Sequence, residues 1–219
     1  IMKKTILLFS ALLIFGNLSA QDKAALVNPI IGTNGMGHTF PGACVPFGLV
    51  QLSPDTDTIP HNVDGKYQPR AYEYCAGYQH KDSSIVGFSH THFSGTGHSD
   101  LGDILIMPAT GELKLNPGTA TDPDGGYRSR FSHDTEVSRP GYYEVMLADY
   151  GVKAQLTATK RVGVHKYTFP KEAKNQRIIL DMIHGIYNYG GKVLWTNIRV
   201  ENDTLVTGYR ITNGWARTN

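Results

Sequence analysis

The 219-residue sequence has no apolar stretch long enough to cross a membrane and no block of basic residues. Its apolar run, ILLFSALLIFG at 6–16, is well short of the ~20 residues that a membrane-spanning helix needs. Lys and Arg total 21 against 19 Asp and Glu, and this net charge of +2 is scattered along the chain. A transmembrane anchor and a nucleic-acid partner are therefore both disfavoured.

Cysteine is also scarce, and the two present are Cys44 and Cys75. No cysteine follows the apolar run, so a lipid anchor is not indicated. Two cysteines alone do not establish a disulfide, although an oxidising compartment would let one persist. A Cys44–Cys75 bridge and two free thiols lining a cleft both remain open.

The N-terminus has the layout of a secretory signal peptide. Two lysines at 3–4 precede the apolar run, and the following segment, NLSA at 17–20, ends in a small residue. We therefore predict a signal peptide over residues 1–20 and a secreted or periplasmic location, with a buried N-terminal helix as the alternative. The remaining 21–219 suits one large domain or two small ones.

Amphipathic helical periodicity is missing from the rest of the chain. Apolar and polar residues alternate instead at 143–147, 152–158 and 205–211, which is typical of half-buried strands. The continuous apolar run RIILDMI at 177–183 favours a strand buried on both faces, and Asn-Asp at 202–203 predicts a hairpin turn.

The first half is rich in loops, because segments such as 28–48 are too dense in glycine and proline for a helix. Short strands separated by turn signals predict an all-β fold, an antiparallel β-sandwich with a loop-rich first half. A parallel α/β fold would need crossover helices, which the pattern does not offer.

One polar cluster, VGFSHTHFSGTGHSDLGD at 86–103, attracts attention. On a strand, His90 and His92 would point to the same face. With His98 they could bind Zn²⁺ or Fe²⁺ in a metal-dependent enzyme. The alternative is a buried hydrogen-bond network.

The same cluster contains Asp100 and Asp103, three positions apart. Paired carboxylates can act as general acid and base in a glycosidase. At this spacing they fit better as turn formers that accept backbone N–H groups.

Two further motifs could contact a ligand. The glycine-rich GMGHTFPG at 35–42 lacks the lysine of a phosphate-binding loop, but it could offer a hydrogen bond and a ring to a sugar. The tyrosines of AYEYCAGY at 71–78 could stack on a sugar face. A tight turn and core packing are the respective structural alternatives.

Four strings taken together resemble the N-terminal domain of glycoside hydrolase family 92. They are NPIIGTNGMGHTFPGACVPFGLVQLSPDT, GYQHKDSSIVGFSHTHFSGTGHSDLGDILIMP, LTATKRVGVHKYTFP and GYRITNGWA, at 28–56, 77–108, 156–170 and 208–216. The resemblance runs from about residue 26 to the last residue, and its GFSHTHFSGTG and GHTFPGA strings are highly specific.

This resemblance implies a secreted, calcium-dependent, exo-acting α-mannosidase that cleaves mannosides, commonly α-1,2-linked, with inversion. The family pairs an N-terminal β-sandwich of the galactose-mutarotase or supersandwich type with a C-terminal (α/α) barrel, and the active site lies between them. Its catalytic carboxylates and most calcium ligands belong to the barrel. We therefore expect the sandwich to be incomplete at its C-terminal end, with no catalytic residue and no metal ligand in this chain.

The resemblance also implies roles for residues of the sandwich. A wall of the substrate pocket is expected at His38, Thr39 and Phe40, the site of the leaving sugar near Tyr74 and Cys75, and a contact to the sugar at His92. The cleft edge would be braced by a polar network of His90, Ser94, Thr96, Asp100 and Asp103. The family often has Trp in the string that here carries Tyr72 and Tyr74, so the linkage preference stays open.

The expected partners are a mannose-containing glycan and the protein's own C-terminal catalytic domain. A stand-alone carbohydrate-binding β-sandwich without hydrolytic activity is the alternative function.

Overall fold

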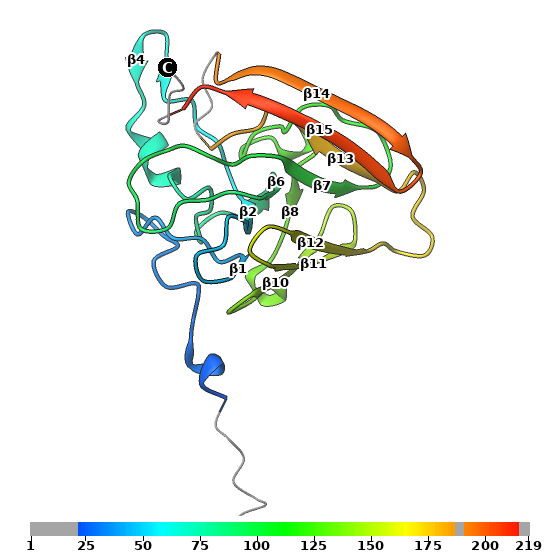
Figure 1. Cartoon of the computed structure of the whole chain (residues 1–219), viewed down its shortest axis with the longest axis horizontal. Helices are drawn as coiled ribbons and strands as arrows, with labels where there is room; N and C mark the ends of the chain where they lie inside the picture. The colour runs from blue at the N-terminus through cyan, green and yellow to red at the C-terminus, as the bar shows by residue number, and fades with distance from the viewer. Residues whose placement is uncertain (1–21, 187–190, 215–219) are drawn as a thin grey trace, which may run out of the picture.

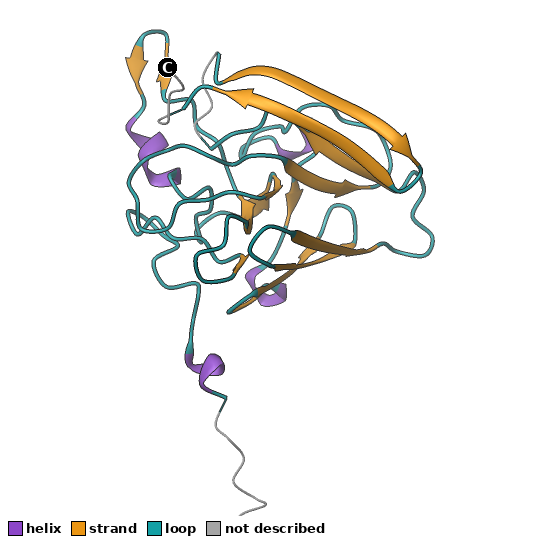
Figure 2. Cartoon of the chain, viewed as in Figure 1, coloured by secondary structure: helices purple, strands orange, loops and turns teal. Residues whose placement is uncertain are grey.

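The computed structural model describes residues 22–186 and 191–214, so the predicted signal peptide and Trp215 lie outside the described residues. Every strand pair in it is antiparallel. Helical structure among the described residues is limited to short 3-10 turns: η1 (Lys23–Leu26), η2 (Pro69–Tyr74), η3 (Pro123–Gly125) and η4 (His133–Thr135). The predicted all-β, antiparallel fold is confirmed (Figure 2). None of these helices is long and apolar enough to cross a membrane.

Two sheets form the body of the molecule (Figure 1). The five-stranded sheet has the order β1 (Ala43–Cys44), β2 (Gln51–Asp55), β6 (Gly87–Ser89), β7 (Leu105–Ala109) and β13 (Arg177–Asp181). The four-stranded sheet has the order β12 (Gly163–Thr168), β11 (Val152–Ala158), β10 (Tyr142–Leu147) and β9 (Val137–Arg139).

The core lies between these two sheets. The Phe88 ring of β6 is 6.4 Å from the Tyr143 ring of β10 and 6.3 Å from the Tyr167 ring of β12. Along β10 and β11, alternate side chains are buried, as the alternation at 143–147 and 152–158 predicts. Burying one apolar face of each sheet is the main stabilising contribution of such a sandwich.

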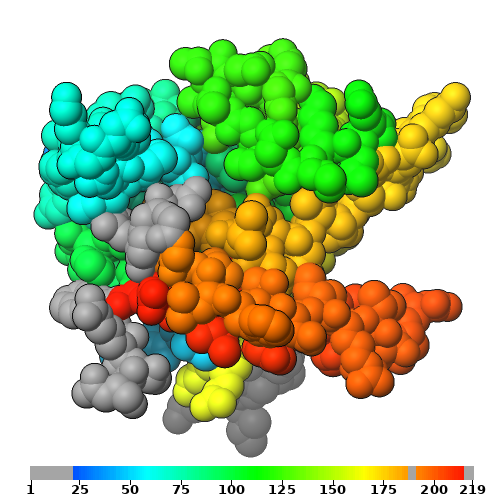
Figure 3. All heavy atoms as spheres, turned by 90° about the horizontal axis from the view of Figure 1, so that it is seen from above, coloured from blue at the N-terminus to red at the C-terminus, as the bar shows by residue number. Residues whose placement is uncertain are grey.

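Three two-stranded sheets complete the fold: β3 (Asn62–Val63) with β4 (Lys66–Tyr67), β5 (Ser84–Ile85) with β8 (Ser129–Arg130), and β14 (Val193–Asn202) with β15 (Leu205–Thr212). The last pair is a long hairpin whose turn follows Asn202, which confirms the predicted turn. In Figure 3 the hairpin forms a ridge of orange and red spheres across one face of the molecule.

Burial in two of the predicted strands differs from the prediction. Ile178 of β13 is 51% exposed, so β13 is not buried on both faces, and almost all of β15 is exposed. The reason is position: β13 is an edge strand, and in the described part of the chain the hairpin pairs only with itself. A cavity of about 520 Å³ separates the hairpin from the outer face of β7 and β13.

Candidate functional site

A cavity of about 560 Å³ opens between the edge strands β1 and β9, and Cys44 of β1 and Arg139 of β9 line it. Four residues expected at the cleft line it: Phe40, His92, Ser94 and Thr96. The Ser138 hydroxyl of β9 donates to the Pro41 carbonyl at 2.5 Å, which ties the two edges together.

Local constraints in the GMGHTFPG segment position Phe40. The Thr39 hydroxyl donates to the Ile31 carbonyl at 3.0 Å, which folds the segment back on itself. Gly37 and Gly42 both lie directly against neighbouring backbone, where a Cβ would overlap it. The Phe40 ring is then 5.2 Å from the His92 ring, so the aromatic side chain that lines the cavity packs against a buried imidazole.

His92 itself is held by a fully buried carboxylate. Its Nε2 is 2.8 Å from Oδ1 of Asp55, the last residue of β2. Oδ2 of Asp55 lies 2.7 Å from His184 Nε2 and accepts the Ser89 hydroxyl at 2.7 Å. Burial opposes ionisation of Asp55, but the charge of His92 and the hydrogen bonds from both histidines outweigh it and hold the Asp55 pKa well below its usual range.

Both ring nitrogens of His92 face oxygen acceptors. Nδ1 donates to the Gln51 carbonyl oxygen at 2.7 Å, and Nε2 lies 2.8 Å from the Asp55 carboxylate. These two contacts fix the orientation of the imidazole, which packs beside the Phe40 ring.

His90 belongs to a separate chain of hydrogen bonds. Its Nδ1 donates to the Ile104 carbonyl at 2.7 Å, and its Nε2 is 3.1 Å from Nε2 of His165 on β12. His165 Nδ1 lies 2.7 Å from the Tyr167 hydroxyl. Burial lowers the pKa of His90, and burial together with His90 lowers that of His165 to about 3. Both imidazoles are therefore neutral, and the chain Tyr167–His165–His90–Ile104 joins the two sheets.

The remaining members of the expected polar network lie in other places. Asp100 forms an ion pair with Lys192 and accepts the Leu101 N–H at 2.9 Å. Asp103 accepts the Thr91 hydroxyl at 2.7 Å and pairs with Arg210 of β15 at 3.0 Å.

The structure therefore divides the expected network among separate clusters. Within the described residues, Ser94 and Thr96 take part in none of the side-chain hydrogen bonds and instead line the cavity. This is a correction to the single bracing network, and its cause is the bend at 91–103, which turns successive side chains to different neighbours.

The residues expected near the leaving sugar are mostly buried. The Tyr74 hydroxyl donates to both carboxylate oxygens of Asp82, at 3.1 and 3.0 Å. Cys75 is buried with Sγ 3.3 Å from the Ser99 hydroxyl, and burial raises its thiol pKa. Tyr72 is the exposed ring of this motif.

His38 lies beside these residues. Its ring makes an edge contact with Tyr72 at 4.8 Å, its carbonyl accepts the Gly95 N–H at 2.6 Å, and its buried Nε2 has no hydrogen-bond partner among the described residues. The three expected segments, at 38–40, 72–75 and 94–99, thus meet at one corner of the sandwich.

The alternatives left open by the sequence are resolved in part. Cys44 and Cys75 are both free thiols, so the bridge does not form. His90, His92 and His98 do not converge on a common point, and the one group of three candidate metal ligands among the described residues is elsewhere, at His80, His133 and Glu136.

Sequence reasoning missed Asp55, which holds His92, and His184, which holds Asp55. They are 129 positions apart, and nothing in the local pattern at either position relates them. The only signal at Asp55 is that a charged residue ends a strand whose other residues are mostly buried.

Comparison with known proteins finds relatives of this chain in sequence and in structure. The model of the glycosyl hydrolase family 92 N-terminal domain matches residues 26–219. A curated protein from Arthroderma benhamiae, described as an uncharacterized secreted glycosidase, is 30% identical over 158 residues, which are 68% of this chain and 18% of that protein.

Two solved structures from Bacteroides thetaiotaomicron are similar over most of the chain. The family GH92 α-mannosidase BT3965 in complex with mannoimidazole has a TM-score of 0.79 and 47% identity, and the match covers 88% of this chain and 23% of that one. The family GH92 inverting mannosidase BT2199 has a TM-score of 0.61 and 25% identity, covering 89% and 24%. The chain thus spans less than a quarter of the length of these relatives.

Proposed function

The chain belongs to glycosyl hydrolase family 92 and forms its N-terminal domain, and on this premise we propose that it is part of a secreted, calcium-dependent exo-α-mannosidase. The reaction would release mannose from α-mannosides, commonly α-1,2-linked, with inversion. The single observation that carries this proposal is the 47% identity to a family α-mannosidase that binds mannoimidazole. Export would depend on the predicted signal peptide at 1–20.

In this proposal the chain supplies one wall of the substrate pocket. Phe40 offers an apolar ring to a sugar face, and His92 lies behind it, held by Gln51 and Asp55. Stacking on a sugar needs such a rigid ring, because a mobile one would lose side-chain entropy on binding. Inversion needs a general acid and a general base ~6.5–9.5 Å apart with a water between them. We assign both carboxylates to the C-terminal domain.

Calcium would also be bound mainly by that domain. Calcium prefers six to eight oxygen ligands, whereas the three candidate ligand side chains that meet in the described residues include two imidazoles. The carboxylates of Asp55, Asp100 and Asp103 are already paired with histidine, lysine and arginine. These groups therefore do not offer the oxygen-rich set of ligands that calcium prefers, and no step of the reaction is assigned to calcium.

The test uses the product of the complete open reading frame that contains this chain. We expect it to release mannose from α-1,2-mannobiose, to produce the β-anomer first in an NMR time course, and to lose activity with a calcium chelator. Hydrolysis that persists in chelator would refute the calcium dependence alone. No hydrolysis of any α-mannoside by the folded protein would refute the mannosidase.

A stand-alone carbohydrate-binding sandwich is the second candidate. It is favoured by the cavity itself, which is lined by three phenylalanines of this chain, Phe40, Phe47 and Phe93. Binding of mannosides by a product without hydrolysis would support it. Hydrolysis by the complete product would exclude it.

A further inference from the structure

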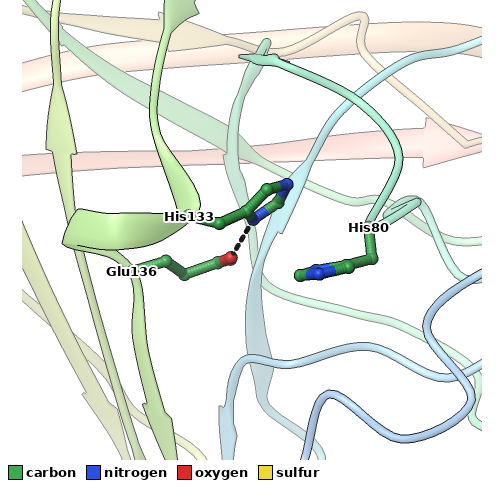
Figure 4. Close-up of side chains that lie close together, drawn as sticks. All are labelled: His80, His133 and Glu136. Atoms are coloured by element: carbon green, nitrogen blue, oxygen red, sulfur yellow. Dashed lines mark hydrogen bonds and ion pairs between the residues drawn. The ribbon is translucent and has the colours of Figure 1, made fainter.

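Three side chains with metal-binding atoms meet on the side of the sandwich where η4 packs beside the segment that follows Tyr78 (Figure 4). His133 lies in η4 and Glu136 directly follows it, so an i, i+3 spacing brings both to one side of the turn. His80 comes from the other segment, where its N–H donates to the Thr33 carbonyl at 2.8 Å.

The three groups are close enough to share an ion. One candidate ligand atom from each lies within 4.8 Å of the others. Nδ1 of His133 is 2.6 Å from a Glu136 carboxylate oxygen, and the His80 and His133 rings are 4.0 Å apart and tilted by 37°. Tetrahedral Zn²⁺ at ~2.0–2.1 Å from each ligand would need only a modest approach of these side chains.

The carboxylate of Glu136 is held in place by hydrogen bonds from the core of the sandwich. It accepts the Tyr78 hydroxyl at 2.9 Å and the Tyr143 hydroxyl at 2.7 Å, and both tyrosines are buried in the core. Burial and the Glu136 charge raise the pKa of both phenols, so they remain donors. Such outer hydrogen bonds are what orient ligating carboxylates in known metal sites.

The site is also accessible. The His133 side chain is 37% exposed whereas that of Glu136 is 3% exposed. An ion could therefore enter from solvent onto a fixed carboxylate. An ion pair between His133 and Glu136 would explain the contact of these two residues alone. His80 Nδ1 lies 3.4 Å from the Tyr78 hydroxyl, which also donates to Glu136, so the second imidazole is directed toward the same carboxylate.

From this geometry we propose that His80, His133 and Glu136 bind Zn²⁺ or a similar first-row divalent ion. Two imidazole nitrogens and one carboxylate oxygen suit such ions and not calcium. Three protein ligands leave one position for water. Because the ligands come from segments 53 positions apart, the ion would tie the 77–82 segment to η4. None of the three residues lines the cavity that contains Phe40, so this site does not depend on the proposed mannosidase activity.

The test titrates the complete, chelator-treated protein with Zn²⁺ by calorimetry and with Co²⁺ by visible absorption. We expect one Zn²⁺ to be lost in His80→Ala relative to the parent, a Co²⁺ spectrum of tetrahedral intensity, and a rise in melting temperature with Zn²⁺. Tyr143→Phe keeps the ring but removes a hydrogen bond to Glu136, and it should weaken Zn²⁺ affinity about 10–100-fold.

The matched control is His61→Ala, which removes another half-buried histidine stacked on an aromatic ring, at 4.7 Å from Tyr67. It should bind Zn²⁺ as the parent does. Equal Zn²⁺ binding by the parent and by both His80→Ala and His133→Ala would overturn the proposal. A Co²⁺ spectrum that is the same in these variants as in the parent would also overturn the proposal. Circular dichroism in chelator shows separately whether each variant is folded, so a loss of folding is not mistaken for a loss of metal binding.

Discussion

Asp55 and His92 form a fully buried ion pair in which both ring nitrogens of the histidine face oxygen acceptors. Nε2 is 2.8 Å from the Asp55 carboxylate and Nδ1 is 2.7 Å from the Gln51 carbonyl. This arrangement links the strand β2 to the bend that carries the cavity wall. It gives His92 a structural role, because both of its ring nitrogens already have partners within the protein.

His92→Ala should destabilise the protein by about 3–5 kcal/mol, because it leaves one oxygen of the buried Asp55 carboxylate without its partner. In the complete protein it should also weaken catalysis, since the Phe40 ring loses its support. Urea unfolding and mannosidase kinetics measure the two effects. Ser94→Ala, at an exposed position of the same segment whose hydroxyl makes no hydrogen bond among the described residues, should change stability little. Unchanged kinetics and melting temperature in His92→Ala would contradict this role.

Gly77→Ala should destabilise the protein by more than the backbone conformation alone explains. Gly77 has φ +77°, and a Cβ there would overlap Oδ1 of Asp55. Gly65 has the same φ of +77° but has no atom within 4 Å of its Cβ position. Gly65→Ala should therefore cost only the left-handed penalty of about 1–2 kcal/mol. Equal losses from the two variants, measured by urea unfolding, would show that Asp55 tolerates displacement.

Acidification should destabilise the protein already below pH ~6.5, because the folded state keeps His165 neutral with a pKa of about 3. The unfolded chain binds a proton near the ordinary histidine pKa of ~6.5, so stability is complete above that pH and falls as pH drops toward 3. The slope can reach about 1.4 kcal/mol per pH unit for each such group.

His165→Gln should flatten this slope between pH 7.5 and 5, measured by urea unfolding at each pH. Leu115→Gln provides the control, because it changes an exposed side chain that does not titrate and should leave the slope unchanged. A slope that is the same in His165→Gln and in the parent would refute the neutral imidazole pair. Below pH ~4, protonation of Asp55 should add a second loss of stability, since its folded pKa is held low.

Phe40→Ala should lower kcat/KM of the complete enzyme at least ~10-fold, because an aromatic contact of about 1.5–3 kcal/mol is removed from the wall. The ring lies over a buried residue, so melting temperature should be followed in parallel. Leu115→Ala, at a side chain that is 83% exposed and outside the cavity, is the control. An unchanged kcat/KM on α-mannosides would place the sugar elsewhere.

Local pattern was sufficient to predict the two central strands of the four-stranded sheet, β10 and β11. The alternation of Tyr143, Val145 and Leu147 reports which face of a strand is apolar, and that face is buried here. The pattern does not report what covers an apolar face. The prediction that the strand at 177–183 is buried on both faces was therefore wrong for Ile178, which lies on the edge strand β13. An apolar run indicates a need for cover, whereas burial depends on elements far away in the sequence.

The candidate site, like the fold, could be predicted from the sequence only in part. The GHTFPGA motif drew attention to Phe40 because glycine and aromatic residues are conspicuous in a short string. Phe40 packs on His92, and the residues behind His92, first Asp55 and then His184, are brought together only by the assembled sheets. The local sequence also does not predict that His80 lies beside η4. The segment of His80 and the turn η4 are joined through the buried Glu136 carboxylate and the hydroxyls of Tyr78 and Tyr143.

The separation of Asp55 from His184 also has a consequence for the assembly of the domain. Oδ2 of Asp55 accepts the Ser89 hydroxyl, 34 positions later, and the His184 imidazole, 129 positions later, completes its hydrogen bonds. Burying the carboxylate before His184 is in place would leave it one hydrogen bond short, which costs free energy. We therefore expect the domain to reach full stability only once the segment that carries His184 has joined the sheets, and pairing segments so far apart in the sequence slows folding.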